Sequence, residues 1–124
     1  MEENLSEEMY KEHLLELYKS PENYGELSNP SNEYTETNSS CGDEITMQLI
    51  IKNDVVEDVK FQGSGCVMSI VSSSLLTDKI KGMKLEDVNK LAKDDILELL
   101  GIKIGLARLK CVLLPLYALK NSLK

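Results

Sequence analysis

The chain has 124 residues and a formal net charge of −7. This length suits one compact domain, and a hydrophobic content of 42% is enough to bury a core, which excludes wholesale disorder. The negative charge argues against a nucleic-acid binder, because phosphate binding needs a basic surface. The chain contains no run of about 18 apolar residues, so we expect no membrane-spanning helix and no membrane partner.

The first ten residues are acidic and polar, and they lack the apolar stretch of a secretory signal. We therefore expect a cytoplasmic protein. Thiols stay reduced in the cytoplasm, so the three cysteines indicate ligands or nucleophiles rather than disulfides. The odd number agrees, since three cysteines cannot all pair within one chain.

The N-terminal part of the chain is predicted to be a helix followed by a polar loop. Ser6 to Lys19 has apolar residues at a helical period, and Pro21 ends this helix. Asn23 to Ser40 is rich in Asn, Ser, Thr and Glu, which predicts a long irregular segment. We expect a single domain over residues 1–124, in which residues 1–40 form the N-terminal helix and a mobile polar loop.

A hairpin and several helices are predicted after this loop. Ile45 to Lys52 and Val55 to Gln62 have the apolar content of strands, and Asn53-Asp54 is a hairpin turn signal. Glycines near residue 64 are expected to end the second strand. The predicted helices are Val67–Lys81, capped by Gly82, then Lys84–Leu91, Asp94–Leu100 and Cys111–Leu123. The predicted fold class is α+β, a small antiparallel β-sheet packed with helices.

Pro115 limits where the last helix can begin. Proline has no N–H, and a helix tolerates it in the first turn, where the N–H groups have no partner within the helix. We therefore predict that this helix begins near Lys110 or Cys111, after a glycine-interrupted connector.

The three cysteines, Cys41, Cys66 and Cys111, each lie at a predicted junction. Cys41 ends the polar loop, whereas Cys66 and Cys111 each open a predicted helix. A helix N-terminus lowers the pKa of a thiol, and the thiolate is both a metal ligand and a nucleophile. Asp43 lies two residues after Cys41, and side chains at this spacing in an extended segment point to the same side.

These four residues are therefore predicted to bind a metal centre. Three thiolates and a carboxylate suit tetrahedral zinc, and three thiolates with one weaker ligand also suit a labile iron–sulfur cluster. One alternative is inert packing, because free cysteines are often buried. Another is a structural zinc domain that serves only protein interaction.

Cys111 and Cys41 are the candidate nucleophiles, and a nucleophilic thiolate of this kind is able to act as a persulfide acceptor. Lys110 lies beside Cys111 and is either a solvated charge or a cation that lowers the thiol pKa. Cys41 ends a loop that can move toward a partner. Cys66 is the poorest candidate, because the helix that it opens should pack its apolar face into the core.

Two further features are interpreted as structural. His13 is the only histidine and is expected on the surface. Ser72-Ser73-Ser74 has no histidine base nearby in sequence, which indicates the small face of a closely packed helix.

The chain contains four short sequence motifs in a particular order, and their combination is specific although each motif alone is weak. They are Tyr18 to Gly25, Cys41-Gly42-Asp43, Gly65-Cys66 with Ser72-Ser73-Ser74-Leu75 and Lys81-Gly82, and Arg108-Leu109-Lys110-Cys111. Over nearly its whole length the chain resembles the U-type iron–sulfur scaffold family, which includes IscU, SufU and the N-terminal domain of NifU.

The resemblance implies an iron–sulfur cluster assembly scaffold. Such a protein receives sulfur from a pyridoxal-phosphate-dependent cysteine desulfurase, binds iron or a [2Fe-2S] cluster and transfers the cluster to apoproteins. The resemblance also implies that Cys41, Asp43, Cys66 and Cys111 line the site. The alternative is a SufU-type zinc-dependent sulfurtransferase that accepts persulfide sulfur from the desulfurase.

The chain combines features of two branches of this family. IscU-type members have a histidine directly before the third cysteine. This chain has Lys110 at that position, which is the SufU-like state. Gly105 to Leu109 replaces the Leu-Pro-Pro-Val-Lys motif that a chaperone recognises, so dependence on a dedicated Hsp70-type chaperone is not expected. The interval from Cys66 to Cys111 is too short for the insertion that SufU proteins usually carry, so this spacing is IscU-like.

Overall fold

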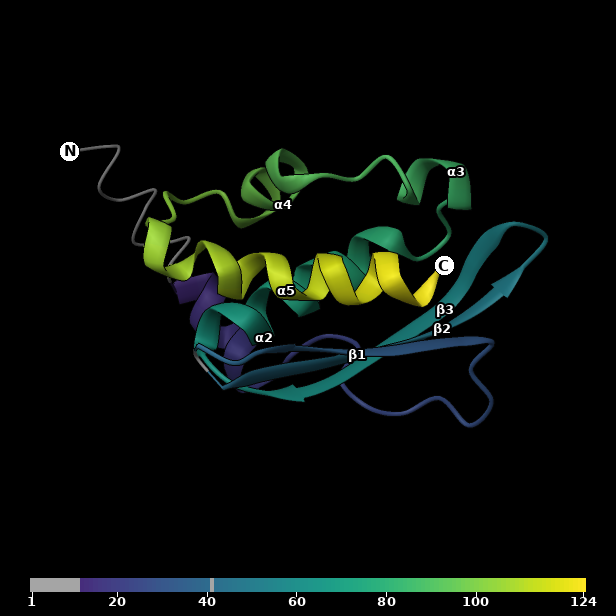
Figure 1. Cartoon of the computed structure of the whole chain (residues 1–124), viewed down its shortest axis with the longest axis horizontal. Coiled ribbons are helices and arrows are strands. Elements are labelled where there is room, and N and C mark those ends of the chain that lie inside the picture. The colour runs from purple at the N-terminus through teal and green to yellow at the C-terminus, as the bar shows by residue number, and fades with distance from the viewer. Residues whose placement is uncertain (1–11, 41) are drawn as a thin grey trace.

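The structure is a computed structural model that describes residues 12–40 and 42–124. After a helix at residues 12–19, the elements are β1 (Asn32–Asn38), β2 (Asp43–Lys52), β3 (Val55–Ser64), α2 (Val67–Ile80), α3 (Leu85–Val88), α4 (Lys93–Leu100) and α5 (Leu106–Ser122). The strands form one antiparallel sheet in the order β1-β2-β3, and α2 and α5 pack on one face of it (Figure 1). The α+β prediction is confirmed. None of the helices within the described ranges is long and apolar enough to cross a membrane.

The β2–β3 hairpin supplies the sheet side of the core. Asn53 and Asp54 have φ angles of 54° and 60°, and a two-residue turn with positive φ at both positions matches the twist of the strands. On β2, Ile45, Met47 and Leu49 alternate into the core and are fully buried. The pairing shifts between Ile50 and Ile51, and this bulge lets two valines of β3 that are three residues apart, Val56 and Val59, both face the core.

The prediction that residues 23–40 are entirely irregular is wrong, because this segment contains the strand β1. Asn32–Asn38 pairs with β2 over seven residues, and its side chains are mostly exposed because it is an edge strand. With neither face fully buried, the strand needs no alternation of apolar residues. Hydrogen bonds to β2 stabilise it, together with cross-strand pairs such as Thr35–Thr46, whose hydroxyls lie 2.6 Å apart.

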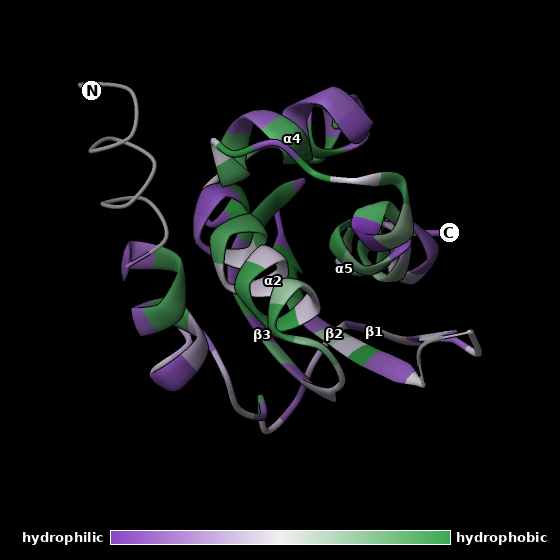
Figure 2. Cartoon of the chain, turned by 90° about the vertical axis from the view of Figure 1, so that its left-hand side faces the viewer, coloured by the Kyte–Doolittle hydropathy of each residue, from purple (hydrophilic) through white to green (hydrophobic). Residues whose placement is uncertain are grey.

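Helix α2 lies at the centre of the molecule (Figure 2). It contacts β3, α4 and α5, and ten of its fourteen residues are buried. Ser72, Ser73 and Ser74 are each at most 1% exposed, which agrees with their interpretation as a closely packed face. The helix ends at Ile80, and Gly82 follows with a φ of +81°, the conformation predicted for its cap.

Helix α5 begins five residues earlier than predicted, at Leu106, so Pro115 lies inside the helix. The prediction that Pro115 must lie in the first turn is therefore wrong. Interior proline weakens a helix, but tertiary packing offsets this cost, because the segment Cys111 to Leu116 is buried throughout. The Ser72 hydroxyl also donates to the carbonyl of Val112 at 2.6 Å, close to the proline.

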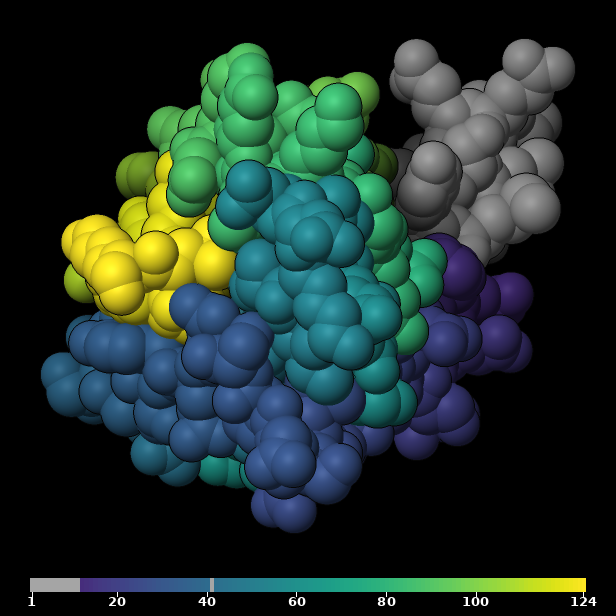
Figure 3. Space-filling model, turned by 90° about the vertical axis from the view of Figure 1, so that its right-hand side faces the viewer, coloured from purple at the N-terminus to yellow at the C-terminus, as the bar shows by residue number. Residues whose placement is uncertain are grey.

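The C-terminal end of α5 lies against the sheet edge. Figure 3 shows the last residues, in yellow, beside β1, in blue. The Asn32 amide donates to the carbonyl of Ser122 at 2.8 Å, and the Asn121 amide donates to the Glu36 carboxylate at 2.8 Å. These contacts join the polar edge strand to the helix that closes the core.

Candidate metal centre

Three predicted site residues meet at one end of the sheet. Asp43 is the first residue of β2, Cys66 is the N-cap of α2 and Cys111 lies in the second turn of α5. One carboxylate oxygen and the two sulfur atoms all lie within 4.8 Å of one another. The fourth predicted residue, Cys41, lies outside the described residues.

Asp43 is held in place by the start of α2. Its side chain is 1% exposed, and its Oδ1 accepts the Cys66 N–H at 2.9 Å while its Oδ2 accepts the Ser69 hydroxyl at 2.7 Å. The carboxylate therefore caps α2 from another element, because Cys66 itself makes no side-chain cap. A carboxylate accepts about four hydrogen bonds, and the lone pairs that the Cys66 and Cys111 thiols use become available to an ion when those thiols are deprotonated.

Gly65 makes this close approach possible. Its φ is +146°, a conformation that residues with side chains rarely adopt. A Cβ atom at this position would lie 2.2 Å from Oδ1 of Asp43 and 2.6 Å from its Cγ. The absence of a side chain at Gly65 is thus what lets the buried carboxylate reach the N–H of Cys66.

The hydrogen bonds keep Asp43 in its charged form. Burial acts to raise the pKa of its carboxyl group, but hydrogen bonds from the Ser69 hydroxyl, the Cys66 N–H and the Cys111 and Cys66 thiols act to lower it. Together they hold the pKa of Asp43 below its ordinary value. At neutral pH the site therefore presents a carboxylate.

The two described cysteines differ in their surroundings. Cys66 is half-buried and opens a helix, as predicted. Cys111 is only 3% exposed and lies five residues after the start of α5, so its predicted place at a helix N-terminus is wrong. Lys110 is exposed, and successive helix residues point about 100° apart, so its influence on the Cys111 thiol stays a prediction.

The donor atoms suit a thiophilic metal. Ligands of tetrahedral zinc with Zn–S bonds of about 2.3 Å lie roughly 3.8 Å apart. The carboxylate and thiols, within 4.8 Å of one another, need to draw in by about 1 Å to reach this spacing. Two thiols and one carboxylate, all buried or half-buried, also fit iron. Cys41 is the further thiol ligand that the sequence predicts.

One residue of the site, Ser69, was not predicted. Its hydroxyl donates to Asp43, yet serine is not a usual metal ligand. Its position did hold a signal, since Ser69 lies in the first turn of the helix that Cys66 opens. Sequence spacing alone does not show that this hydroxyl faces Asp43.

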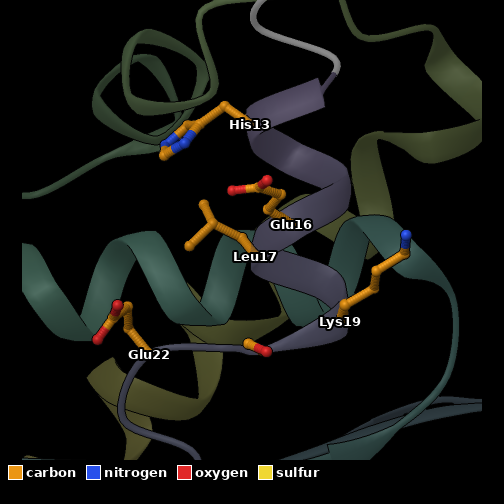
Figure 4. A pocket seen from close by; sticks show the side chains of 6 residues that line it. His13, Glu16, Leu17, Lys19 and Glu22 are labelled. Atoms are coloured by element: carbon orange, nitrogen blue, oxygen red, sulfur yellow. The ribbon is translucent and has the colours of Figure 1, made fainter.

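Among the described residues, surface hollows also lie outside the ligand set. A groove of about 610 Å³ runs beside the site, lined by Tyr18, Lys19, Pro21, Tyr24, Gly63, Ser64, Gly65 and Ile70. A second hollow of about 450 Å³ lies along the helix at residues 12–19 and contains His13 and Glu22 (Figure 4). His13 is exposed, as predicted, and neither Asp43 nor the two described cysteines line this second hollow.

Comparison with known proteins gives relatives over nearly the whole chain. The zinc-dependent sulfurtransferase SufU of Bacillus subtilis is 33% identical over 92% of this chain and 88% of the relative. The iron–sulfur cluster assembly scaffold protein IscU of Thermotoga maritima is 33% identical over 94% of this chain and 93% of the relative. The chain covers a smaller share, 61%, of the scaffold protein IscU 1 of Archaeoglobus fulgidus, to which it is 33% identical.

The fold is also similar to solved structures. A crystal structure of a proposed iron–sulfur cluster assembly scaffold protein for the SUF system, from Fervidobacterium islandicum AW-1, matches with a TM-score of 0.78 and 28% identity. The match covers 90% of this chain and 93% of that structure. The family model of the NifU-like N terminal domain matches residues 9–124. The chain belongs to the NifU-like N terminal domain family.

Proposed function

We propose that the protein is an iron–sulfur cluster assembly scaffold. It receives sulfur from a pyridoxal-phosphate-dependent cysteine desulfurase, binds iron or a [2Fe-2S] cluster and transfers the cluster to apoproteins in the cytoplasm. The observation that supports this proposal is the convergence of Asp43, Cys66 and Cys111 from three separate elements to within 4.8 Å. The similarity to scaffold proteins named IscU gives independent support.

In this proposal the three thiolates, with Cys41 as the third, are the ligands that persist, and Asp43 is the ligand that exchanges. Carboxylate oxygen binds iron less tightly than thiolate does, so Asp43 is the position at which a cluster can be handed to an acceptor. The carboxylate does not lose all its partners when it leaves the metal, because Ser69 and the Cys66 N–H hold it.

Sulfur would reach this site as a persulfide. An acceptor thiolate attacks the outer sulfur of the donor persulfide, a new S–S bond forms as the donor's S–S bond breaks, and the donor cysteine leaves as a thiolate. The sequence placed Cys111 and Cys41 ahead of Cys66 as acceptors. The sequence favoured Cys111 slightly over Cys41, but burial of Cys111 to 3% exposure argues against it as the acceptor in the metal-free protein, so in this proposal Cys41 takes the first place.

A zinc-dependent sulfurtransferase is the second candidate function. The relative that bears this name is as similar to the chain as the scaffold proteins are, and Lys110 matches the SufU-like state. Zinc would occupy the same four side chains, and one cysteine would leave the metal to take the persulfide sulfur.

Anaerobic purification separates the two functions. A scaffold should contain iron and acid-labile sulfide after reconstitution, and should then pass them to an apo-ferredoxin. A sulfurtransferase should instead contain about one zinc per chain and accept persulfide sulfur from desulfurase and cysteine with zinc bound. The variant Asp43→Ala, tested beside the wild type, shows whether the observed binding uses this site. Retention of full metal content by both Cys66→Ser and Cys111→Ser would contradict either function.

A further inference from the structure

The hydroxyl of Ser69 donates to a charged side chain, whereas those of Ser72, Ser73 and Thr77 donate to backbone carbonyls. Ser73 donates to the carbonyl of Ser69 at 2.8 Å, and Thr77 donates to the carbonyl of Ser73 at 2.8 Å. Bonding to the carbonyl one turn earlier is the ordinary choice for such residues inside a helix. Ser69 instead donates to a carboxylate on β2, at 2.7 Å.

Ser69 also contacts a second member of the site. Its Oγ lies 3.6 Å from the sulfur of Cys66, within reach of a thiol donor. The hydroxyl has one proton, and the buried charged oxygen of Asp43, at the shorter distance, is the better acceptor for it. Ser69 therefore lies between the carboxylate and the thiol, and it is fully buried.

We propose that Ser69 is the positioning residue of the metal centre, which rests on the proposed function of that centre. Its hydroxyl fixes the rotamer of Asp43 and sets the distance between the carboxylate and Cys66. The backbone N–H of Cys66 bonds only Oδ1, and the Cys66 and Cys111 thiols lose their protons when they bind a metal, so in the metal-bound state Ser69 is what holds Oδ2. Residues that hydrogen-bond a metal ligand typically change metal affinity by about 10- to 100-fold when they are removed.

The test uses Zn²⁺ and Co²⁺ alone, titrated into metal-free, reduced protein. The variant Ser69→Ala removes the hydroxyl, and Ser73→Ala is the matched control, because Ser73 is on the same helix, is equally buried and donates only to a backbone carbonyl. Ser69→Thr restores a hydroxyl. Urea unfolding of each metal-free variant shows whether it folds.

We expect Ser69→Ala to bind Zn²⁺ about 10- to 100-fold more weakly than wild type, while Ser73→Ala stays within about threefold. With Co²⁺, the thiolate-to-cobalt absorption of Ser69→Ala should be unchanged per bound ion, but the d–d bands should weaken as the carboxylate leaves a tetrahedral site. Ser69→Thr should restore both readouts. A structural role alone would not change the d–d bands selectively.

Several results would overturn the inference. It fails if Ser69→Ala binds Zn²⁺ within about threefold of wild type, if Ser73→Ala weakens binding equally, or if a folded Ser69→Thr does not recover affinity. The threonine variant decides the matter if the alanine variant does not fold. A wild-type protein that binds neither ion would defeat the proposed centre and the inference with it, whereas tight wild-type binding with an unaffected Ser69→Ala defeats the inference alone.

Discussion

Replacing Gly65 with alanine tests the close approach on which the metal centre depends. The new Cβ would lie 2.2 Å from Oδ1 of Asp43, so the carboxylate must move and release the N–H of Cys66. The φ of +146° also strains any residue other than glycine. Both effects act on the metal-free protein, so they can be measured without any ligand.

The expected loss of stability follows from these two effects. Backbone strain costs about 1–3 kcal/mol, and loss of a hydrogen bond to a charged group costs about 1.5–3 kcal/mol. Gly65→Ala should therefore lower the free energy of unfolding by about 2.5–6 kcal/mol. Gly82→Ala is the control, since Gly82 has a φ of +81° but a Cβ added there would have no atom within 4 Å. Strain alone predicts a loss of about 1–2 kcal/mol there.

Urea unfolding of the reduced, metal-free proteins measures both losses. At a slope of about 2 kcal/mol per molar urea, a difference in loss of about 2 kcal/mol means that Gly65→Ala should lower the midpoint by about 1 M more than Gly82→Ala does. It should also lower zinc affinity, which Gly82→Ala should leave intact. Equal losses of stability in the two variants would refute the placement of the Asp43 carboxylate against Gly65.

Four further results are expected. Cys66→Ser and Cys111→Ser should each abolish tight metal binding, measured as metal content after anaerobic purification; full content in either variant would exclude that residue as a ligand. Asp43→Ala should slow transfer of a reconstituted cluster to an apo-ferredoxin, because an exchangeable carboxylate is lost, and faster loss would contradict the role of Asp43. Because the pKa of Asp43 is lowered in the folded protein, its carboxylate stabilises the fold above about pH 4, and this stabilisation is lost as the pH falls through the folded-state pKa. Asp43→Asn should therefore reduce the loss of stability at acid pH, measured by urea unfolding at several pH values. An unchanged dependence of stability on pH would refute this role of Asp43. Ser72→Ala removes the hydroxyl that joins α2 to the Val112 carbonyl of α5 and should cost about 0.5–1.5 kcal/mol in the same assay, whereas no loss would show that this bond adds no stability.

The elements that have a buried face could be predicted from the sequence. Alternation in β2, the Asn53-Asp54 turn and the apolar content of α2 are direct consequences of packing on one core. β1 was not predicted because an exposed edge strand needs no apolar pattern. Its pairing with β2 depends on backbone hydrogen bonds between segments that are separate in the sequence. The start of α5 was misplaced because the rule for Pro115 considers the helix alone and omits the packing that offsets the cost.

The sequence predicted which residue types form the candidate site, but it did not predict how they are arranged. Asp43, Cys66 and Cys111 were expected to share one centre because of their ligand chemistry and their places near element ends, and the structure brings the three together. The role of Ser69 depends on the rotation of α2 about its axis, which the sequence does not specify to within one residue. Cys111 was expected at a helix N-terminus because the start of α5 was placed five residues too late, so the error in that boundary led directly to the error about its position.

The three candidate ligands come from β2, α2 and α5, so the site spans more than half of the chain length. Bringing together residues so far apart in sequence costs loop-closure entropy, and the helix that carries Cys111 is synthesised after the other two elements. A nascent chain therefore presents Asp43 and Cys66 before all three side chains can meet. In the proposed centre, tight metal binding requires that α5 has docked, so bound metal would mark completed folding.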